Sequence, residues 1–350
     1  MKTIAITLGD AAGIGPEIIA AAWEQLQAIP DCKPIIYGHP EILRRAAKLR
    51  NAPTNIECLS CCSDDVLSVP PGVIDARAGR SAYQAVCRSI DDAKAGVVDA
   101  IVTAPIHKAA LHQAGYLYPG HTEIFAEQCG ADNFAMMLYL GGNGIPIQRE
   151  TPDAGNLALE IASPYGLAVV HVTLHTAMRT IFEQITVESV LAKIRLAAGF
   201  MRRIMGQDAS RLPQIGVCSL NPHAGEEGLF GDEEIRIIQP AIQKALAEGL
   251  QVAGPKPADT IMLDAREGRY DAVVAMFHDQ GHIALKLLGM YRAVNITLGL
   301  PIIRTSVAHG TAFDKAWQGI ASPGSLIEAV RVAVRLTKTS SGPSAVPNAG

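Results

Sequence analysis

The first 26 residues, MKTIAITLGDAAGIGPEIIAAAWEQL (1–26), join an apolar run, a glycine-rich turn and an amphipathic segment without interruption. The run at 3–7 has the length and residue types of a β-strand, and the segment at 17–26 has the length of a helix. Pro16 suits the first turn of that helix, where a backbone N–H needs no partner. The stretch therefore predicts a strand followed directly by a helix, which is the repeating unit of α/β folds.

The same alternation continues along the chain. Further strands are predicted at 34–37, 100–103, 135–140, 167–174, 214–220, 272–277 and 293–297, and helices at 41–49, 81–95, 187–205, 233–248 and 325–336. This order predicts a largely parallel sheet with helices on both faces. At 350 residues the chain is long enough for two domains or for one large domain. Residues 141–165 are predicted to form a surface insertion and 338–350 a flexible tail.

Composition limits the class of protein. Of 350 residues, 49% are hydrophobic and 18% charged, as in a compact globular protein. A formal net charge of −4 gives no reason to expect nucleic acid or an anionic membrane as a partner. No apolar run reaches the roughly 18 residues of a membrane span, and the N-terminus lacks a signal-peptide pattern, so we expect a cytoplasmic protein. Seven scattered cysteines predict no disulfide framework.

Three histidines stand just beyond predicted strands. His175, His223 and His278 are each the first imidazole after an apolar run. Ligands of open α/β sheets bind at the carboxyl ends of strands, and three neutral imidazoles with one open position suit a catalytic divalent metal such as zinc. Simple capping of each strand end is the competing interpretation, because separated histidines have no diagnostic spacing.

A second set of side chains is suited to an anion. Lys286, Asn295 and Arg304 rise from otherwise apolar sequence, and Arg offers a bidentate fork to carboxylate or phosphate. His121 and Thr122 open a predicted helix, whose N-terminal amides favour an anion, although a plain helix cap explains Thr122 equally well. The glycines at 9, 13 and 15 lack the third position of a dinucleotide fingerprint, so no cofactor-binding residue is identified.

Six segments together resemble the 4-hydroxythreonine-4-phosphate dehydrogenase family. They are GDAAGIGPE (9–17), TAPIHK (103–108), GHTE (120–123), NPHAGEEGLFGDEE (221–234), HDQGHIALK (278–286) and VNITLGLPIIRTS with HGTAFD (294–306 and 309–314). The matches run in order over nearly the whole chain. The resemblance implies an isocitrate/isopropylmalate-dehydrogenase-like α/β/α fold of two subdomains with a cleft between them. These would be residues 1–128 with 268–337, and residues 129–267, which would carry the dimer interface of a homodimer with shared active sites. The resemblance further implies NAD as oxidant and a divalent metal, which would be Zn, Mg, Mn or Co.

The resemblance also implies roles for single residues. Metal ligands would be His175, His223 and His278, with His278 supplied by the partner subunit. Substrate contacts would be His121, Thr122, Lys286, Asn295 and Arg304. The group that takes the substrate's hydroxyl proton would be His121, Asp279 or Lys286.

Departures from the family pattern bear on the substrate. His107 and Ala308 stand where the family usually has Asn and Asp, whereas residues 282–283, 287–290 and 316–317 resemble a branch acting on sugar acids. We therefore expect oxidation and decarboxylation of 4-phospho-D-threonate or 4-phospho-D-erythronate to dihydroxyacetone phosphate and CO2. The alternatives are the 4-phospho-hydroxythreonine oxidation of pyridoxal phosphate biosynthesis and a non-catalytic protein that binds sugar-acid phosphates.

Overall fold

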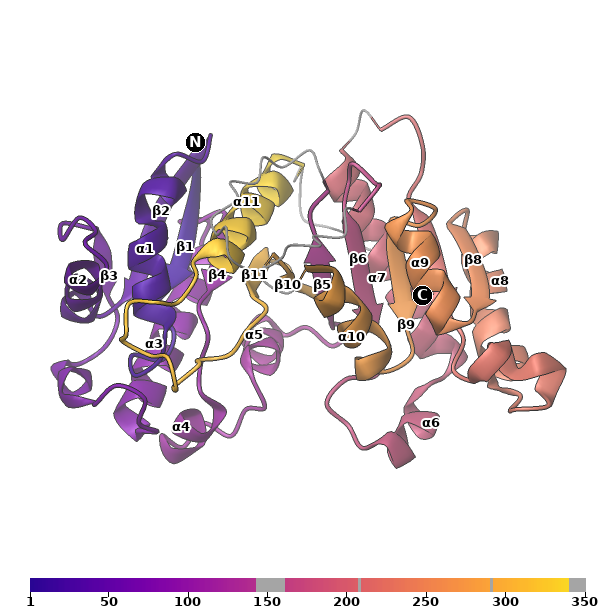
Figure 1. Cartoon of the computed structure of the whole chain (residues 1–350), viewed down its shortest axis with the longest axis horizontal. Helices are drawn as coiled ribbons and strands as arrows, with labels where there is room; N and C mark the ends of the chain where they lie inside the picture. Colours follow the sequence, from indigo (N-terminus) through magenta and orange to yellow (C-terminus); the bar gives the residue numbers. More distant parts are fainter. Residues whose placement is uncertain (143–160, 207–208, 290–291, 340–350) are drawn as a thin grey trace. The chain divides into compact units, whose positions relative to one another are not determined.

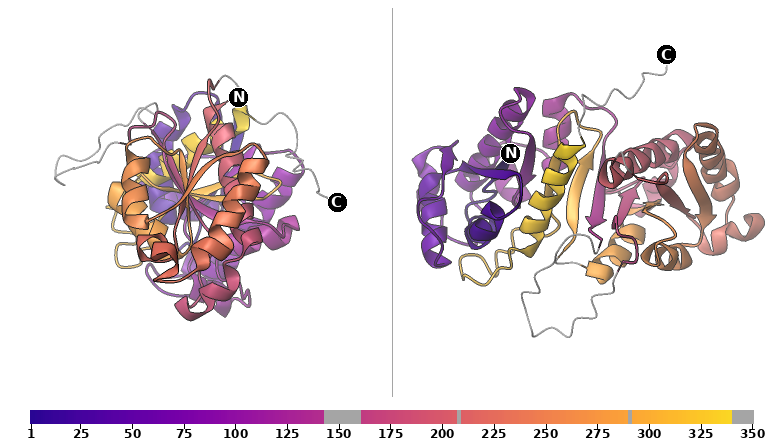
Figure 2. Two further views of the ribbon diagram at one scale, coloured as in Figure 1. Left: turned by 90° about the vertical axis from the view of Figure 1, so that its right-hand side faces the viewer. Right: turned by 90° about the horizontal axis from the view of Figure 1, so that it is seen from above.

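The computed structural model describes residues 1–142, 161–206, 209–289 and 292–339. The chain divides into two compact units, Met1–Phe134 with Val294–Gly350, and Ala135–Ala293 (Figures 1 and 2). Most of the predicted insertion (143–160) and nearly all of the predicted tail (340–350) lie outside the described residues. Within the described ranges, no helix has the length and apolar character of a membrane span.

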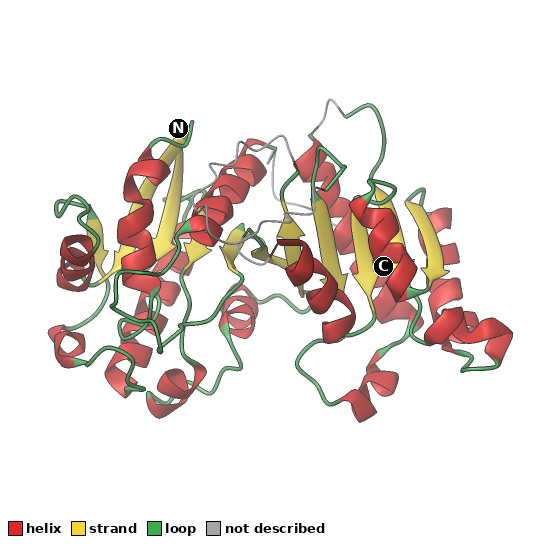
Figure 3. Ribbon diagram, viewed as in Figure 1, coloured by secondary structure: helices red, strands yellow, loops and turns green. Residues whose placement is uncertain are grey.

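The first unit is built on a mostly parallel sheet in the order β3-β2-β1-β4-β11-β10. Its strands are β1 (Lys2–Thr7), β2 (Cys32–Gly38), β3 (Cys58–Ser60), β4 (Ala100–Thr103), β10 (Val294–Leu298) and β11 (Arg304–Val307). Its helices are α1 (Gly15–Gln27), α2 (Pro40–Leu49), α3 (Ala76–Lys94), α4 (Lys108–Gln113), α5 (His121–Cys129) and α11 (Gly324–Lys338) (Figure 3). Only β10 and β11 pair antiparallel among these strands.

Alternation along β11 separates the two faces of this sheet. The Thr305 hydroxyl donates to the carbonyl of Ala329 in α11 at 2.9 Å, while the Arg304 guanidinium lies 5.4 Å from the centroid of the Phe125 ring in α5. Because successive strand residues point to opposite faces, α11 and α5 cover opposite sides of β11. Arg304 is thus directed toward the face that carries His121, the first residue of α5.

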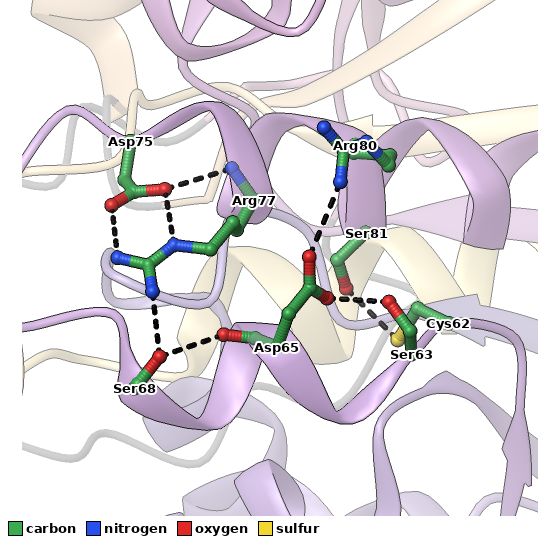
Figure 4. Close-up of polar contacts among 8 residues, drawn as sticks. All are labelled: Cys62, Ser63, Asp65, Ser68, Asp75, Arg77, Arg80 and Ser81. Atoms are coloured by element: carbon green, nitrogen blue, oxygen red, sulfur yellow. Dashed lines mark hydrogen bonds and ion pairs between the residues drawn. The ribbon is translucent and has the colours of Figure 1, made fainter.

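A closed polar network fixes the start of α3. Asp75 caps this helix by accepting hydrogen bonds from the Arg77 amide at 2.8 Å and from its guanidinium at 2.6 and 2.9 Å (Figure 4). Arg77 also donates to Ser68, and Arg80 donates to Asp65, in the preceding turn Asp64–Ser68. The cap explains why α3 begins five residues before the predicted helix at 81–95.

The second unit is built on the sheet β5-β6-β9-β7-β8, in which only β5 and β6 pair antiparallel. Its strands are β5 (Ala135–Leu140), β6 (Leu167–His171), β7 (Gln214–Cys218), β8 (Gln251–Lys256) and β9 (Ala272–Ala275). Its α-helices are α6 (Ile181–Gln184), α7 (Val187–Met205), α8 (Gln239–Ala247), α9 (Ala258–Arg266) and α10 (His278–Gly289). The buried carboxylate of Asp271 accepts from the Arg211 guanidinium at 2.5 and 2.8 Å and from the Gln214 amide at 2.8 Å, and so ties the start of β9 to β7.

The predicted α/β class is confirmed, and every predicted strand is present. The domain boundary lies elsewhere, because residues 268–293, assigned to the first subdomain, belong to the second unit. The physical reason is that β9 pairs with both β6 and β7 in the middle of that sheet. The segment that begins at His278 is a helix, α10, and the structure adds β3, β8 and β11 to the predicted strands.

Candidate functional site

The three candidate metal ligands all follow strands of the second unit. His175 lies four residues after β6, His278 is the first residue of α10 after β9, and His223 lies in the turn Pro222–Gly228 after β7. Strands β6, β9 and β7 are parallel neighbours, so their carboxyl ends meet at one edge of the sheet. The structure therefore places all three loops at the same edge.

Two side chains cross-link these strand ends. The amide and hydroxyl of Thr173 both donate to the carbonyl of Met276, at 3.1 and 2.9 Å. The side-chain oxygen of Gln280 accepts from the Met276 amide at 2.7 Å, and its amide group donates to the carbonyl of Ser219 at 2.7 Å. Thr173 thus joins the β6 end to the β9 end, and Gln280 joins the β9 end to the β7 end.

The ring of His278 is held by two neighbours on its own helix. Its Nδ1 lies 2.6 Å from a carboxylate oxygen of Asp279, and its ring stacks on that of His282 with centroids 3.8 Å apart and planes inclined by 12°. A carboxylate beside Nδ1 favours the tautomer with the proton on Nδ1, which leaves the lone pair of Nε2 for a metal. The ring of His175 lies with its centroid 6.0 Å from that of His278. At metal–nitrogen distances of about 2 Å, two imidazoles spaced in this way can reach one ion.

His223 occupies an unusual stretch of backbone. Residues 223–227 all have positive φ, from 44° to 78°, which is a left-handed turn in which four of the five residues are not glycine. Such backbone is costly and persists only where neighbouring groups hold it. The buried carboxylate of Glu234 anchors the residues just before this stretch, since it accepts from the amides of Leu220 and Asn221 at 2.7 and 2.8 Å and from the Asn221 side chain at 2.9 Å.

The three candidate ligands do not converge within the described part of one chain. Among the described residues, no group of three or more His, Cys, Asp or Glu side chains is close enough to hold an ion. The chain brings His175 and His278 together, whereas His223 is exposed on its own turn. Convergence of all three imidazoles therefore stays a prediction.

The candidate anion contact Arg304 is a buried cation. It is 2% exposed, and its guanidinium donates to the hydroxyls of Thr297 and Thr103 at 3.0 and 2.7 Å. Its Nε has no hydrogen-bond partner among the described residues. Burial lowers the pKa of Arg304 to about 9, although the carboxylate of Glu123 acts in the opposite direction. The protein thus holds a positive charge largely among neutral groups.

Two further candidates contribute unpaired buried atoms to the same unit. His121 Nε2 and Asn295 Oδ1 are buried and lack a hydrogen-bond partner in the described structure. Burial and the charge of Arg304 hold the pKa of His121 well below its usual range, which keeps that imidazole neutral near pH 7. Asn295 and Thr297 stand opposite Ser306 and Arg304 in the β10–β11 ladder, so Asn295 shares a sheet face with Arg304.

The remaining substrate candidates are Thr122 and Lys286. Thr122 is the second residue of α5, whose cap position is taken by Gly120, so the plain-cap interpretation of Thr122 is wrong. Lys286 is half-buried on α10 and is the one predicted substrate contact that belongs to the second unit. Asp279, a candidate proton acceptor, lies beside His278 as described above.

Three residues near the carboxyl ends of β1 and β4 were not predicted as site residues from the sequence. Asp10 is fully buried, and one of its oxygens accepts from the Ala12 amide at 2.9 Å. Its other oxygen, the Thr7 hydroxyl and His107 Nδ1 have no hydrogen-bond partner in the part of the chain described. Burial raises the pKa of Asp10 to about 6, and the charge of Asp75 acts in the same direction, while the Ala12 amide opposes it.

The position of this cluster favours a cofactor. Strand β1 has β2 on one side and β4 on the other, so the order of the sheet reverses there, and ligands of open α/β sheets bind at such points. The His107 ring also stacks on Phe313 at 4.6 Å. The signal was present in the polar residues that follow the first strand, but the glycine spacing alone did not reveal it.

Comparison with known proteins shows the family to which this chain belongs. Residues 30–333 match the family described as pyridoxal phosphate biosynthetic protein PdxA. The chain is 40% identical to D-threonate 4-phosphate dehydrogenase of Pectobacterium atrosepticum, over 96% of this chain and 99% of the relative. It is 41% identical to 4-hydroxythreonine-4-phosphate dehydrogenase of Beijerinckia indica, over 95% and 94%. A solved 4-hydroxythreonine-4-phosphate dehydrogenase from Klebsiella pneumoniae aligns with a TM-score of 0.78 at 38% identity, over 96% and 100%.

Proposed function

The chain belongs to the PdxA family of dehydrogenases, and on that premise we propose that it oxidises a 4-phosphorylated four-carbon hydroxy acid with NAD and a divalent metal. The proposed substrate is 4-phospho-D-threonate or 4-phospho-D-erythronate. Oxidation of its C3 hydroxyl transfers a hydride to NAD and releases a proton, giving a β-keto acid. That acid loses its carboxylate as CO2 and takes up a proton at C2, which yields dihydroxyacetone phosphate.

The observation that carries the proposal is the buried cation Arg304. A buried charge is costly unless it is paired, and Arg304 contacts two hydroxyls and an aromatic ring, while its Nε has no partner among the residues that the structure describes. Phosphate and carboxylate oxygens are the acceptors that a guanidinium binds most strongly. We assign Arg304 and Asn295, with Thr122, His121 and Lys286, to binding the anionic substrate and holding its reacting carbon in place.

The residues present fit a divalent metal. His175, His223 and His278 would hold it, since all three are imidazoles at one sheet edge and Asp279 leaves Nε2 of His278 available. When bound, such an ion lowers the pKa of a substrate hydroxyl and polarises the nascent carbonyl. His121, Asp279 and Lys286 are the candidates for accepting the hydroxyl proton. His121 is suited to that task because its lowered pKa keeps the imidazole unprotonated.

Substitution of Arg304 tests the anion assignment. We expect Arg304→Ala to raise KM for the phosphorylated substrate by 100-fold or more, about 3 kcal/mol of lost charged hydrogen bonding. The dephosphorylated acid should be affected far less. Arg80→Ala is the matched control, because Arg80 is a surface arginine of the same unit and pairs with Asp65. Equal losses on both substrates would refute phosphate binding by Arg304.

A homodimer with shared metal sites is part of the proposal. The family resemblance assigns His278 to the partner subunit, whereas the 6.0 Å spacing of His175 and His278 favours these two on one subunit, with His223 from the other. Activity of heterodimers formed from two inactive variants distinguishes these two arrangements. A dimer of His175→Ala with His278→Ala should regain one site only if His175 and His278 come from different subunits. A dimer of His223→Ala with His278→Ala should regain one site in either arrangement.

The biosynthetic oxidation of 4-phospho-hydroxythreonine is a second candidate function, favoured by the 41% identity to the Beijerinckia indica enzyme. Both substrates should be assayed with NAD under identical conditions, as kcat/KM. We expect the sugar-acid phosphate to be preferred. A preference for 4-phospho-hydroxythreonine would move the chain to the biosynthetic reaction.

A further inference from the structure

Two buried imidazoles of the second unit have no part in the proposed reaction. His171 ends β6 and is 1% exposed, and His282 lies one turn into α10 and is 6% exposed. Nδ1 of His282 lies 3.0 Å from Nε2 of His171, so the two rings share one hydrogen bond. Buried polar groups are costly even when paired, and two apolar side chains would fill the same space at lower cost. The pair therefore calls for a reason other than packing.

Both rings are held rigidly. Helix α10 lies so close to β6 that a Cβ on Gly281 would be 2.5 Å from His171 Nε2 and 2.6 Å from a methyl carbon of Val169. Glycine at this position lets the helix rest directly on the imidazole of His171. The ring of His282 is then fixed between His171, at a centroid distance of 4.6 Å, and His278, at 3.8 Å.

The outermost ring of this stack is a candidate metal ligand. His278 and His282 are four residues apart on α10, where side chains of one helix face meet. Their planes are inclined by only 12°, so the stacking contact with His282 orients the ring of His278. Asp279 contacts His278 through Nδ1 in addition, which sets the tautomer but leaves the ring free to tilt about that bond.

We propose that His171 and His282 are positioning residues that fix the plane of the His278 ring, so that its Nε2 points at the metal. The inference rests on the proposed function, because it gives His278 the role of ligand. His171 supports His282 through the hydrogen bond, and His282 supports His278 through the stacking contact. Removal of outer supports of this kind weakens metal binding in proteins by roughly 10- to 100-fold.

Two substitutions at His282 separate the stacking contact from the hydrogen bond. His282→Gln keeps a group that can hydrogen-bond to His171 but removes the ring, and His282→Phe keeps the ring but removes the hydrogen bond. The affinity of the full-length protein for Co²⁺ is measured by chelator competition, together with the visible absorption of bound Co²⁺. We expect His282→Gln to raise Kd for Co²⁺ ~10-fold or more and to alter the spectrum. His282→Phe should raise Kd by a smaller factor, about threefold, since its ring still stacks on His278 but has lost the hydrogen bond to His171.

Control variants make the outcomes distinct. His39→Leu removes another buried histidine, which hydrogen-bonds to Asp64 in the first unit, and should leave Kd unchanged although it also costs stability. His278→Ala should abolish tight Co²⁺ binding. Wild-type affinity in His282→Gln, or a loss confined to His282→Phe, would overturn the positioning role while leaving the metal assignment intact. Weak Co²⁺ binding by the wild type itself, unchanged in His278→Ala, would overturn the metal assignment and this inference together.

Discussion

Replacement of Asp10 by Asn is expected to stabilise the protein in a pH-dependent way. The carboxylate is fully buried, and burial raises its pKa from 3.8 to about 6. The folded state therefore holds this proton more tightly than the unfolded state. Between pH 4 and 6 unfolding releases a proton, so the Asp10 contribution to stability falls as pH rises through that window and is fully lost above it.

The size of the effect follows from the shift. At 1.36 kcal/mol per pKa unit, the roughly two-unit elevation corresponds to about 3 kcal/mol of destabilisation at pH 7 and to almost none at pH 4. Asn cannot ionise, yet its side-chain oxygen can still accept the hydrogen bond from the Ala12 amide. We expect Asp10→Asn to match the wild type near pH 4 and to exceed it by about 3 kcal/mol at pH 7.

The measurement is guanidinium unfolding of both proteins at pH 4, 5, 6, 7 and 8. Groups remote from Asp10 titrate alike in the two proteins, so the difference between them arises from Asp10 and from Asp75, whose charge is coupled to it. Asp31→Asn is the control: its hydrogen bond with Lys338 lowers the pKa of this exposed carboxylate, so the difference should be small and of opposite sign. The reasoning would be refuted if the difference in free energy of unfolding were constant across pH, or if Asp10→Asn were less stable than the wild type at pH 7.

Three further substitutions test individual hydrogen bonds and packing contacts. The buried carboxylate of Glu17 accepts from the amides of Trp317 and Gly319 at 2.9 Å each, so Glu17→Ala should lower the free energy of unfolding by about 3 kcal/mol in denaturant titrations. Gly281→Ala should cost about 1–3 kcal/mol, because the added methyl group overlaps a neighbouring side chain; an unchanged melting temperature would show that α10 can move away from β6. Glu234→Ala should speed hydrogen exchange at the amides of residues 220 and 221 while leaving α7 protected, and equal protection in both proteins would contradict the bracing role.

The sequence predicted those elements whose residues carry the pattern by themselves. Strand β9 is an unbroken apolar run, β6 is apolar up to its last residue, His171, and α7 has apolar residues at helical spacing, so these elements were found. Strand β11 was missed because RTSV is polar, and its burial depends on the neighbours β4 and β10. Strand β8 was missed because QVAGPK contains Gly and Pro, which are typical of turns.

In the candidate site, too, some features could be predicted from local sequence and others depend on contacts made only in the fold. Alternation along the chain predicts that His175 and His278 follow the carboxyl ends of parallel strands. The order β6-β9-β7, which makes those ends neighbours, came only from the structure. The role of His171 could not be predicted, because it lies inside an apolar run and acquires neighbours only when α10 crosses β6. Likewise, nothing in the segment 221–234 indicates that Glu234 anchors the residues just before the turn carrying His223, since that depends on a carboxylate folding back over 13 residues.

The candidate site residues of the two units differ in how their polar atoms are paired. In the described part of the first unit, Arg304 is a buried charge whose hydrogen-bond partners are hydroxyls, and His121 and Asn295 each have a buried atom without a partner. Such a cluster lowers stability in the free protein, because each unpaired buried atom costs about 1–3 kcal/mol. A ligand whose anionic oxygens meet Arg304 and whose hydroxyl groups donate to acceptors such as Asn295 Oδ1 would supply the missing interactions. In the second unit, the His278 ring contacts the carboxylate of Asp279 and stacks on His282, which is hydrogen-bonded to His171. A metal ligand must be aimed in advance, whereas an anion contact gains most when its partner arrives with the substrate, and the difference in bracing matches the two proposed tasks.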